Sequence, residues 1–259
     1  MLRREALGGS SAFVQRKHDV PRPRPVVQDV LVLPKLEPAT NHYGHDVTGR
    51  VPAAADVPGI GALPPHHDAI WQRAAPYLAV RDNDVHSLYS YGLARALVDL
   101  HPEADPEVVL PGILLHDTGW SQAPPDEVLT AIAPGGNRPD LVLLHEKEGA
   151  RIAQEILADV GHDPRRTEQI VAIVDGHDSR REALSLDDAL VKDADKLWRL
   201  TPHGVDTVME WFGLTREQAH RLIGSRVHEH LFTDAARTIA RGLAAVAWVD
   251  SSQQRVTLG

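Results

Sequence analysis

The periodicity of apolar residues constrains the fold of this 259-residue chain most strongly. From Asp68 onward, apolar residues recur at intervals of three and four positions, with polar residues or prolines between the runs. This spacing places apolar side chains on one face of a helix. No stretch alternates between apolar and polar residues for long enough to indicate a sheet. The sequence therefore predicts an all-α fold.

Residue types that begin and end helices divide this region into segments. The predicted helices span residues 67–79, 84–100, 105–117, 138–160, 164–176, 186–200, 203–212, 215–229 and 233–249. The expected N-caps are Asp84, Asp105, Asp163 and Thr215. Gly161 and Gly213 lie where helices should end. The connection 119–137 is long and rich in turn residues, and we expect it to border a substrate entrance.

Residues 1–65 differ in composition from the rest of the chain. They contain the run PRPRP and several further prolines, and they show little helical periodicity. Proline lacks an amide donor and biases the preceding residue toward extended conformations. We therefore expect residues 1–65 to form a proline-rich arm that is largely irregular or partly disordered, and residues 66–259 to form one helical domain.

The composition excludes several kinds of site and partner. There is no cysteine, so disulfides, thiolate zinc sites and iron–sulfur clusters are ruled out, and a metal ion must be held by nitrogen and oxygen ligands. A net charge of −9 argues against a broad nucleic-acid-binding face, and a small-molecule substrate is expected instead. No apolar run of about 18 residues and no apolar stretch of the secretory type is present, which predicts a cytoplasmic protein without a membrane partner.

Histidine and aspartate residues spread over several predicted helices are candidate metal ligands. They are His86, His116, Asp117, His145, His177 and Asp195. The pair His116-Asp117 closes the apolar helix VVLPGILLHD, and a helix end can direct two successive side chains into one site. Near the end of the series, Asp193 and Asp195 flank the apolar stripe of their helix at similar angles, so helical geometry alone does not choose between them.

The order H…HD…H…H…D, the continuation HDTG and the ending ADKL resemble the HD-domain superfamily of metal-dependent phosphohydrolases, over roughly residues 66 to 200. The resemblance implies that residues 66–259 form an HD-domain helical bundle with additional C-terminal helices. It implies a cofactor of one or two divalent ions, with Fe, Mn, Co, Ni, Zn and Mg all compatible with such ligands. It also favours Asp195 over Asp193 as the last ligand, and Asp193 could instead accept a hydrogen bond from a ligand histidine.

The resemblance also implies a role for each candidate. Residues that would hold the first ion are His86, His116, Asp117 and Asp195. His145 and His177 would coordinate a second ion together with Asp117, which would bridge the two ions. In an enzyme with one ion they would instead act on the substrate phosphate. The implied reaction is hydrolysis of a small phosphate ester, such as a nucleotide, by a metal-activated water, with Asp117, His145 and His177 as the catalytic residues.

Three further residues are candidates for binding the substrate. Lys196 and Arg199 lie near the last ligand on the predicted helix 186–200 and could bind the substrate phosphate, or they could be solvated cations of the helix face. Trp120 stands where some HD hydrolases carry a glutamate or lysine, so a catalytic side chain is not expected there. A tryptophan could stack on a base or close an apolar pocket.

Two other classes of protein stay open. The same ligand order resembles the mixed-valent diiron oxygenases of the HD superfamily, which act on a polyol or an organophosphonate, although the chain lacks the lysine that follows the HD pair in inositol oxygenases. The third class is a non-catalytic HD scaffold that binds a ligand. The arm and the apolar stripes of the C-terminal helices also lead us to expect a homodimer.

Overall fold

The computed structural model describes residues 47–59 and 61–249. Contacts divide the chain into two compact units, residues 1–49 and 50–259. Most of the predicted arm, residues 1–65, lies outside the described residues, and the boundary between residues 65 and 66 stays a prediction. The second unit contains every helix discussed below.

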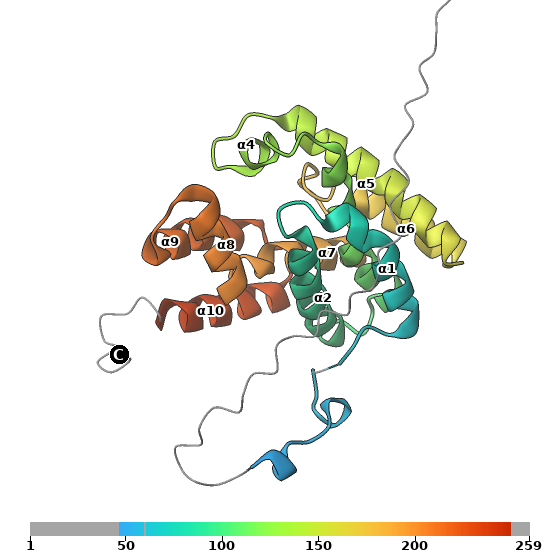
Figure 1. The fold of residues 1–259 in the computed structure, drawn as a ribbon, viewed down its shortest axis with the longest axis horizontal. Coiled ribbons are helices and arrows are strands. Elements are labelled where there is room, and N and C mark those ends of the chain that lie inside the picture. Colours follow the sequence, from blue (N-terminus) through green and yellow to red (C-terminus); the bar gives the residue numbers. More distant parts are fainter. Residues whose placement is uncertain (1–46, 60, 250–259) are drawn as a thin grey trace, which may run out of the picture. The chain divides into compact units, whose positions relative to one another are not determined.

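The described residues form ten α-helices and no strand, which confirms the all-α prediction (Figure 1). The α-helices are α1 Pro65–Leu78, α2 Asn83–Asp99, α3 Pro106–Leu115, α4 Val128–Ile132, α5 Pro139–Asp159, α6 Pro164–Val174, α7 Leu186–Trp198, α8 Pro202–Phe212, α9 Arg216–Val227 and α10 Asp234–Val249. Short 3-10 turns are η1 Thr48–Arg50, η2 Ala54–Asp56, η3 Thr118–Gln122 and η4 His228–His230.

Most of the predicted helix ends are present. The side chains of Asp105 and Asp163 accept hydrogen bonds from backbone amides of the first turns of α3 and α6, and Thr215 forms a capping box at α9. Gly213 ends α8 with a left-handed φ of 62°, which glycine adopts without steric cost. The N-cap prediction at Asp84 was wrong. Helix α2 begins one residue earlier, its N-cap is Asp82, and Asp84 lies in the first turn.

Helix α3 is the centre of the bundle. Every residue from Val108 to Leu115 is buried, and α3 packs against α2, α6 and α7. Helix α5 packs along α6 and against η3, and α8 and α9 pack against each other (Figure 1). Because α3 is apolar on all sides, its C-terminal end delivers the next residues, His116 and Asp117, to the interior of the bundle.

The connection 119–137 contains more regular structure than the sequence predicted. It includes most of η3 and the short helix α4, whose Val128 packs with Trp120, Ala123 and Leu141 in a small separate apolar cluster. Five residues make little more than one helical turn, so α4 is too short for its periodicity to be recognised.

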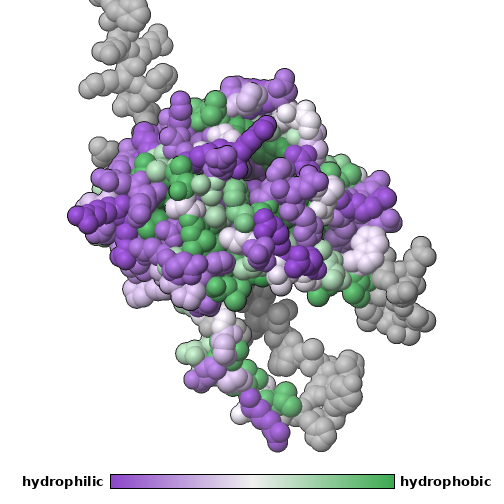
Figure 2. Space-filling view, turned by 180° about the vertical axis from the view of Figure 1, so that it is seen from behind, coloured by the Kyte–Doolittle hydropathy of each residue, from purple (hydrophilic) through white to green (hydrophobic). Residues whose placement is uncertain are grey.

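On the face that Figure 2 shows, apolar residues form small patches among hydrophilic ones. Among residues 47–59 and 61–249, no helix combines the length and the apolar character that a bilayer crossing requires.

Candidate metal centre

The six predicted ligands meet at one place in the bundle. They come from α2, from the residues after α3, from α5, from the turn after α6 and from α7. All are buried, with exposed fractions of 8% or less. The residues are His86, His116, Asp117, His145, His177 and Asp195. Four imidazoles and two carboxylates buried at one place need an ion or a proton between them.

The first group of ligand atoms surrounds His86. Its Nε2 atom lies 3.0 Å from Nε2 of His116 and 3.4 Å from Oδ1 of Asp195. Oδ2 of Asp117 lies 3.6 Å from Nε2 of both His86 and His116. These four residues are the ones that the resemblance assigned to a first ion.

The second group lies on the other side of the Asp117 carboxylate. Oδ1 of Asp117 is 3.5 Å from Nε2 of His177 and 4.0 Å from Nε2 of His145, and these two nitrogens are 3.3 Å apart. One carboxylate therefore presents its two oxygens to two different histidine pairs. This is the arrangement that a bridge between two ions requires.

Backbone and aromatic contacts fix the orientation of the imidazoles. Nδ1 of His116 is 2.8 Å from the carbonyl oxygen of Ile113, and Nδ1 of His177 is 3.0 Å from that of Val174. A ring nitrogen that donates to a carbonyl carries the proton, which leaves Nε2 of the neutral ring with a lone pair for a metal.

The other two imidazoles are held by tryptophans. The ring of His145 stacks on Trp120 at 3.9 Å, and the ring of His86 contacts Trp198 edge-on at 4.5 Å. Within the described residues, the Nδ1 atoms of His86 and His145 have no hydrogen-bond partner. Packing, rather than hydrogen bonding, therefore sets the direction of these two rings.

The two carboxylates are ionised at neutral pH. Burial alone would raise the pKa of Asp117, but His116, a hydrogen bond from His177 and His86 hold this pKa well below its usual range. Burial likewise opposes ionisation of Asp195, and the Arg199 guanidinium and the nearby histidines lower its pKa. The centre thus has two negative charges for a cation to neutralise.

The histidines differ in their protonation. Burial lowers the pKa of His86 to about 4, so its imidazole is neutral. Burial also opposes a charge on His177, but the hydrogen bond to Asp117 and the charge of Asp178 raise the pKa of His177 to about 9. In the metal-free protein a proton on His177 therefore neutralises part of the charge of Asp117.

A glycine explains how the HD pair comes to face α5. Gly119 lies so close to α5 that a Cβ atom at this position would be 1.8 Å from the backbone oxygen of His145. This close approach lets Trp120 stack on His145 and lets its indole N–H donate to Oδ1 of Asp117 over 3.1 Å. The glycine of the HDTG motif thus brings two of the ligand-bearing segments together.

The structure separates Asp193 from Asp195. The Asp193 carboxylate accepts hydrogen bonds from the amide and hydroxyl groups of Thr233 and from the amide of Phe232, at 2.7 to 3.0 Å. It holds the start of α10. Asp195, which the resemblance favoured, is the residue placed beside His86 and His116.

Asp178 is a site residue that the sequence reasoning missed. Its Oδ2 atom lies 3.5 Å from Nε2 of His145 and 3.9 Å from Nε2 of His177. The available signal was a second His-Asp pair after an apolar helix, in the segment VDGHD. The buried Glu146 carboxylate fixes this turn by accepting from the amides of Asp178 and Ser179 and from the Ser179 hydroxyl.

Arg81 is a second residue that the sequence did not indicate. It lies in the turn between α1 and α2, with its guanidinium 5.3 Å from the ring centres of both Trp120 and Trp211. It lines a small cavity that also reaches His86, Asp117 and Asp178. Burial lowers the pKa of Arg81, while Asp117 opposes this shift.

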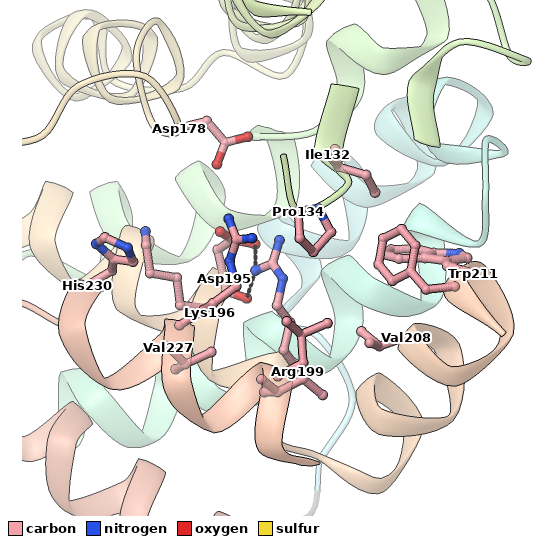
Figure 3. A pocket seen from close by; sticks show the side chains of 14 residues that line it. Ile132, Pro134, Asp178, Asp195, Lys196, Arg199, Val208, Trp211, Val227 and His230 are labelled. Carbon is pink, nitrogen blue, oxygen red and sulfur yellow. Dashed lines mark hydrogen bonds and ion pairs between the residues drawn. The ribbon is translucent and has the colours of Figure 1, made fainter. Parts of the chain in front are cut away.

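A larger pocket of about 180 Å³ opens beside the centre (Figure 3). It is lined by Ile132, Pro134, Asp178, Asp195, Lys196, Arg199, Val208, Trp211, Phe212, Leu222, Ile223, Arg226, Val227 and His230. In Figure 3, Asp178 and Asp195 lie toward one side of the pocket, and Val208 and Trp211 lie toward the other. Ile132 and Pro134 come from the connection 119–137, the segment expected to border the entrance.

The three predicted substrate residues have different positions. Lys196 and Arg199 line this pocket, and Nη1 of Arg199 is 3.5 Å from Oδ1 of Asp195. Trp120 lines only the smaller cavity and has an exposed fraction of 2%. It contacts two of the candidate ligands, His145 and Asp117.

Comparison with known proteins identifies the domain. Residues 83–200 match the family model of the HD domain, and this range contains all six candidate ligands. The described helices and the ligand order agree with that match, so this part of the chain is an HD domain and belongs to the HD-domain superfamily.

The chain is also similar to a solved structure, the crystal structure of a predicted HD superfamily hydrolase from an uncultured Thermotogales bacterium. The two sequences are 19% identical, the match covers 72% of this chain and 91% of that chain, and the TM-score is 0.49. A likeness at this level does not define a function. No curated protein matches the chain.

Proposed function

We propose that this protein is a metal-dependent phosphohydrolase that cleaves a small phosphorylated substrate. The observation that carries the proposal is the Asp117 carboxylate, whose two oxygens face two different histidine pairs beside a pocket lined by cations. The HD domain itself is of the metal-dependent phosphohydrolase type.

The donor set fits divalent metal ions. The ligand atoms lie in clusters within 4.8 Å of one another, and in His116 and His177 the Nδ1 atom faces a backbone carbonyl oxygen, which directs Nε2 toward the ion. The first ion would be held by His86, His116, Asp117 and Asp195, and the second by Asp117, His145, His177 and Asp178. Divalent Fe, Mn, Co, Ni, Zn or Mg would supply Lewis acidity toward a phosphoryl oxygen and would lower the pKa of water.

The chain's own residues would do the remaining work. Asp117 would orient the attacking water, because its carboxylate stays ionised and its Oδ1 is fixed by the Trp120 indole. Lys196 and Arg199 would bind the substrate phosphate and oppose the negative charge that builds up in the transition state. The buried imidazoles of His145 and His177 would exclude bulk water from this side of the site.

The pocket indicates the class of substrate. Its cations, Lys196, Arg199 and Arg226, favour an anionic group, and most of the other lining residues are apolar. Its volume of about 180 Å³ is below the range of about 300–1,000 Å³ of typical drug-sized ligand sites. We therefore propose a small phosphomonoester with an apolar or aromatic body, rather than a polymer.

The test is phosphate release by the metal-loaded full chain. Protein purified without a histidine tag would be loaded with each divalent metal and assayed on a panel of small alkyl, aryl and nucleoside monophosphates. We expect at least one substrate to be hydrolysed, and we expect His116→Gln to lower the rate by more than about 100-fold. The matched control is His101→Gln. His101 is a partly exposed histidine just after the C-terminal end of α2. No phosphate release from any substrate with any metal would contradict the proposal.

A second candidate function is a diiron oxygenase that cleaves an organophosphonate or a polyol. The paired histidines around one carboxylate would also suit two irons, and the cationic pocket would accept a phosphonate. Two irons per chain, a coupled mixed-valent EPR signal and substrate-dependent oxygen uptake would favour it over the hydrolase. A protein that binds no metal at all would instead indicate a non-catalytic scaffold.

A further inference from the structure

A second group of histidines lies outside the metal centre. His66 and His67 lie in the first turn of α1, Glu107 lies in the first turn of α3, and His162 lies in the turn between α5 and α6. Ligand atoms of His66, Glu107 and His162 all lie within 4.8 Å of one another. Glu107 precedes His116 by nine residues, which is about 14 Å along the α3 axis. The group is therefore separate from the centre described above.

The two outer histidines present ring nitrogens to each other. Nε2 of His66 is 2.8 Å from Nδ1 of His162, and the rings stack with an interplanar angle of 9°. Burial and the neighbouring His66 lower the pKa of His162, which keeps this imidazole neutral at neutral pH. Two imidazole nitrogens 2.8 Å apart must share a proton or a cation, and the Glu107 carboxylate beside them favours the cation.

A chain of buried groups orients that carboxylate. The Tyr91 hydroxyl is 2.8 Å from Nδ1 of His67, and Nε2 of His67 is 3.5 Å from Oε1 of Glu107. His67 has an exposed fraction of 2%, and burial lowers its pKa. In metal sites, a ligand is commonly held by such an outer partner, which fixes its direction. This arrangement distinguishes Glu107 from an ordinary surface glutamate.

We infer that His66, His162 and Glu107 form a second metal site, which binds Zn²⁺ or a similar divalent ion through two nitrogens and one oxygen. The site is reached from solvent, because His66 and Glu107 are partly exposed, so water can complete the coordination. An ion there joins the start of α1 to the start of α3 and to the α5–α6 turn. Binding at this point stabilises the fold, since the three segments are far apart in the sequence.

The experiment counts zinc per chain. Metal-stripped full-length wild type, His66→Gln, His162→Gln and the control His101→Gln are incubated with Zn²⁺, passed through gel filtration and analysed by elemental mass spectrometry. We expect both cluster variants to carry one zinc fewer than the wild type and His101→Gln to match the wild type. Equal zinc content in all four proteins would overturn the inference.

Two further measurements separate a ligand from a structural residue. The positioning residue His67, changed to glutamine, should keep the zinc number but weaken zinc binding at this site by about 10- to 100-fold. Circular dichroism checks that each variant is folded, and His66 is a partly exposed side chain whose replacement should not disturb the core. The loss of one zinc in His66→Gln does not depend on the proposed function, because the zinc count involves no phosphate release. If the proposed function holds, His66→Gln should release phosphate at the wild-type rate, because the two sites are separate.

Discussion

Replacing Gly119 by alanine should separate the HD pair from α5. The added Cβ would lie 1.8 Å from the backbone oxygen of His145 and 2.5 Å from the backbone nitrogen of Gly149. The shorter distance is 1.6 Å less than the 3.4 Å at which ordinary contact begins. Both neighbours are backbone atoms of a helix, so neither can rotate away, and η3 must move instead.

The expected cost has two parts. Overpacking in a well-packed interior typically costs about 1–3 kcal/mol, and a backbone clash of this size belongs at the upper end of that range. Moving η3 also displaces Trp120 from His145, and with it the hydrogen bond that holds Asp117. A misplacement of about 1 Å at a catalytic group can lower the rate by about 100-fold.

Urea unfolding of the metal-free protein measures the first part. Metal titration and the rate of phosphate release measure the second. The matched control is Gly92→Ala, at an exposed helical position of α2 where a Cβ would contact nothing within 4 Å. This control should stabilise the protein by about 0.5–1 kcal/mol, because alanine favours the helix. If Gly119→Ala is as stable as the wild type and binds metal equally well, the reasoning about the close approach is refuted.

Four further outcomes follow from the metal centre. His145→Gln should lower the number of metal ions bound per chain, measured by elemental analysis, whereas an unchanged number would make His145 a substrate residue. Asp195→Asn should weaken metal binding with little change in urea stability. Asp193→Asn should do the reverse, costing about 1–3 kcal/mol because three partly buried donors lose a charged acceptor. The pKa of His177 is raised to about 9, so a metal ion must displace a proton from this residue. The affinity for the metal, measured by calorimetry, should therefore rise with pH and level off above about pH 9. A metal affinity that does not change with pH would contradict this. Arg199→Ala should raise KM for a phosphorylated substrate more than it lowers kcat, and an unchanged KM would argue against phosphate binding there.

The sequence by itself determined the helices and most of their ends. Amphipathic spacing and capping are local properties, so the Asp105, Asp163 and Thr215 caps and the glycine at 213 could be recognised without tertiary information. The local signal failed where it was weak, at the start of α2 and in the short α4. The order of histidines and aspartates also sufficed to indicate the superfamily that the family match shows.

Only the tertiary structure decided which carboxylates face the centre. Asp193 and Asp195 point to different sides of α7, and only the packing shows what each side meets: α10 begins beside Asp193, while His86 and His116 lie beside Asp195. The role of Asp178 likewise depends on α5, because His145 of α5 lies beside Asp178 although it is more than thirty residues earlier in the sequence. Such contacts join residues distant in the chain, and helical periodicity carries no information about which faces of separate helices will meet.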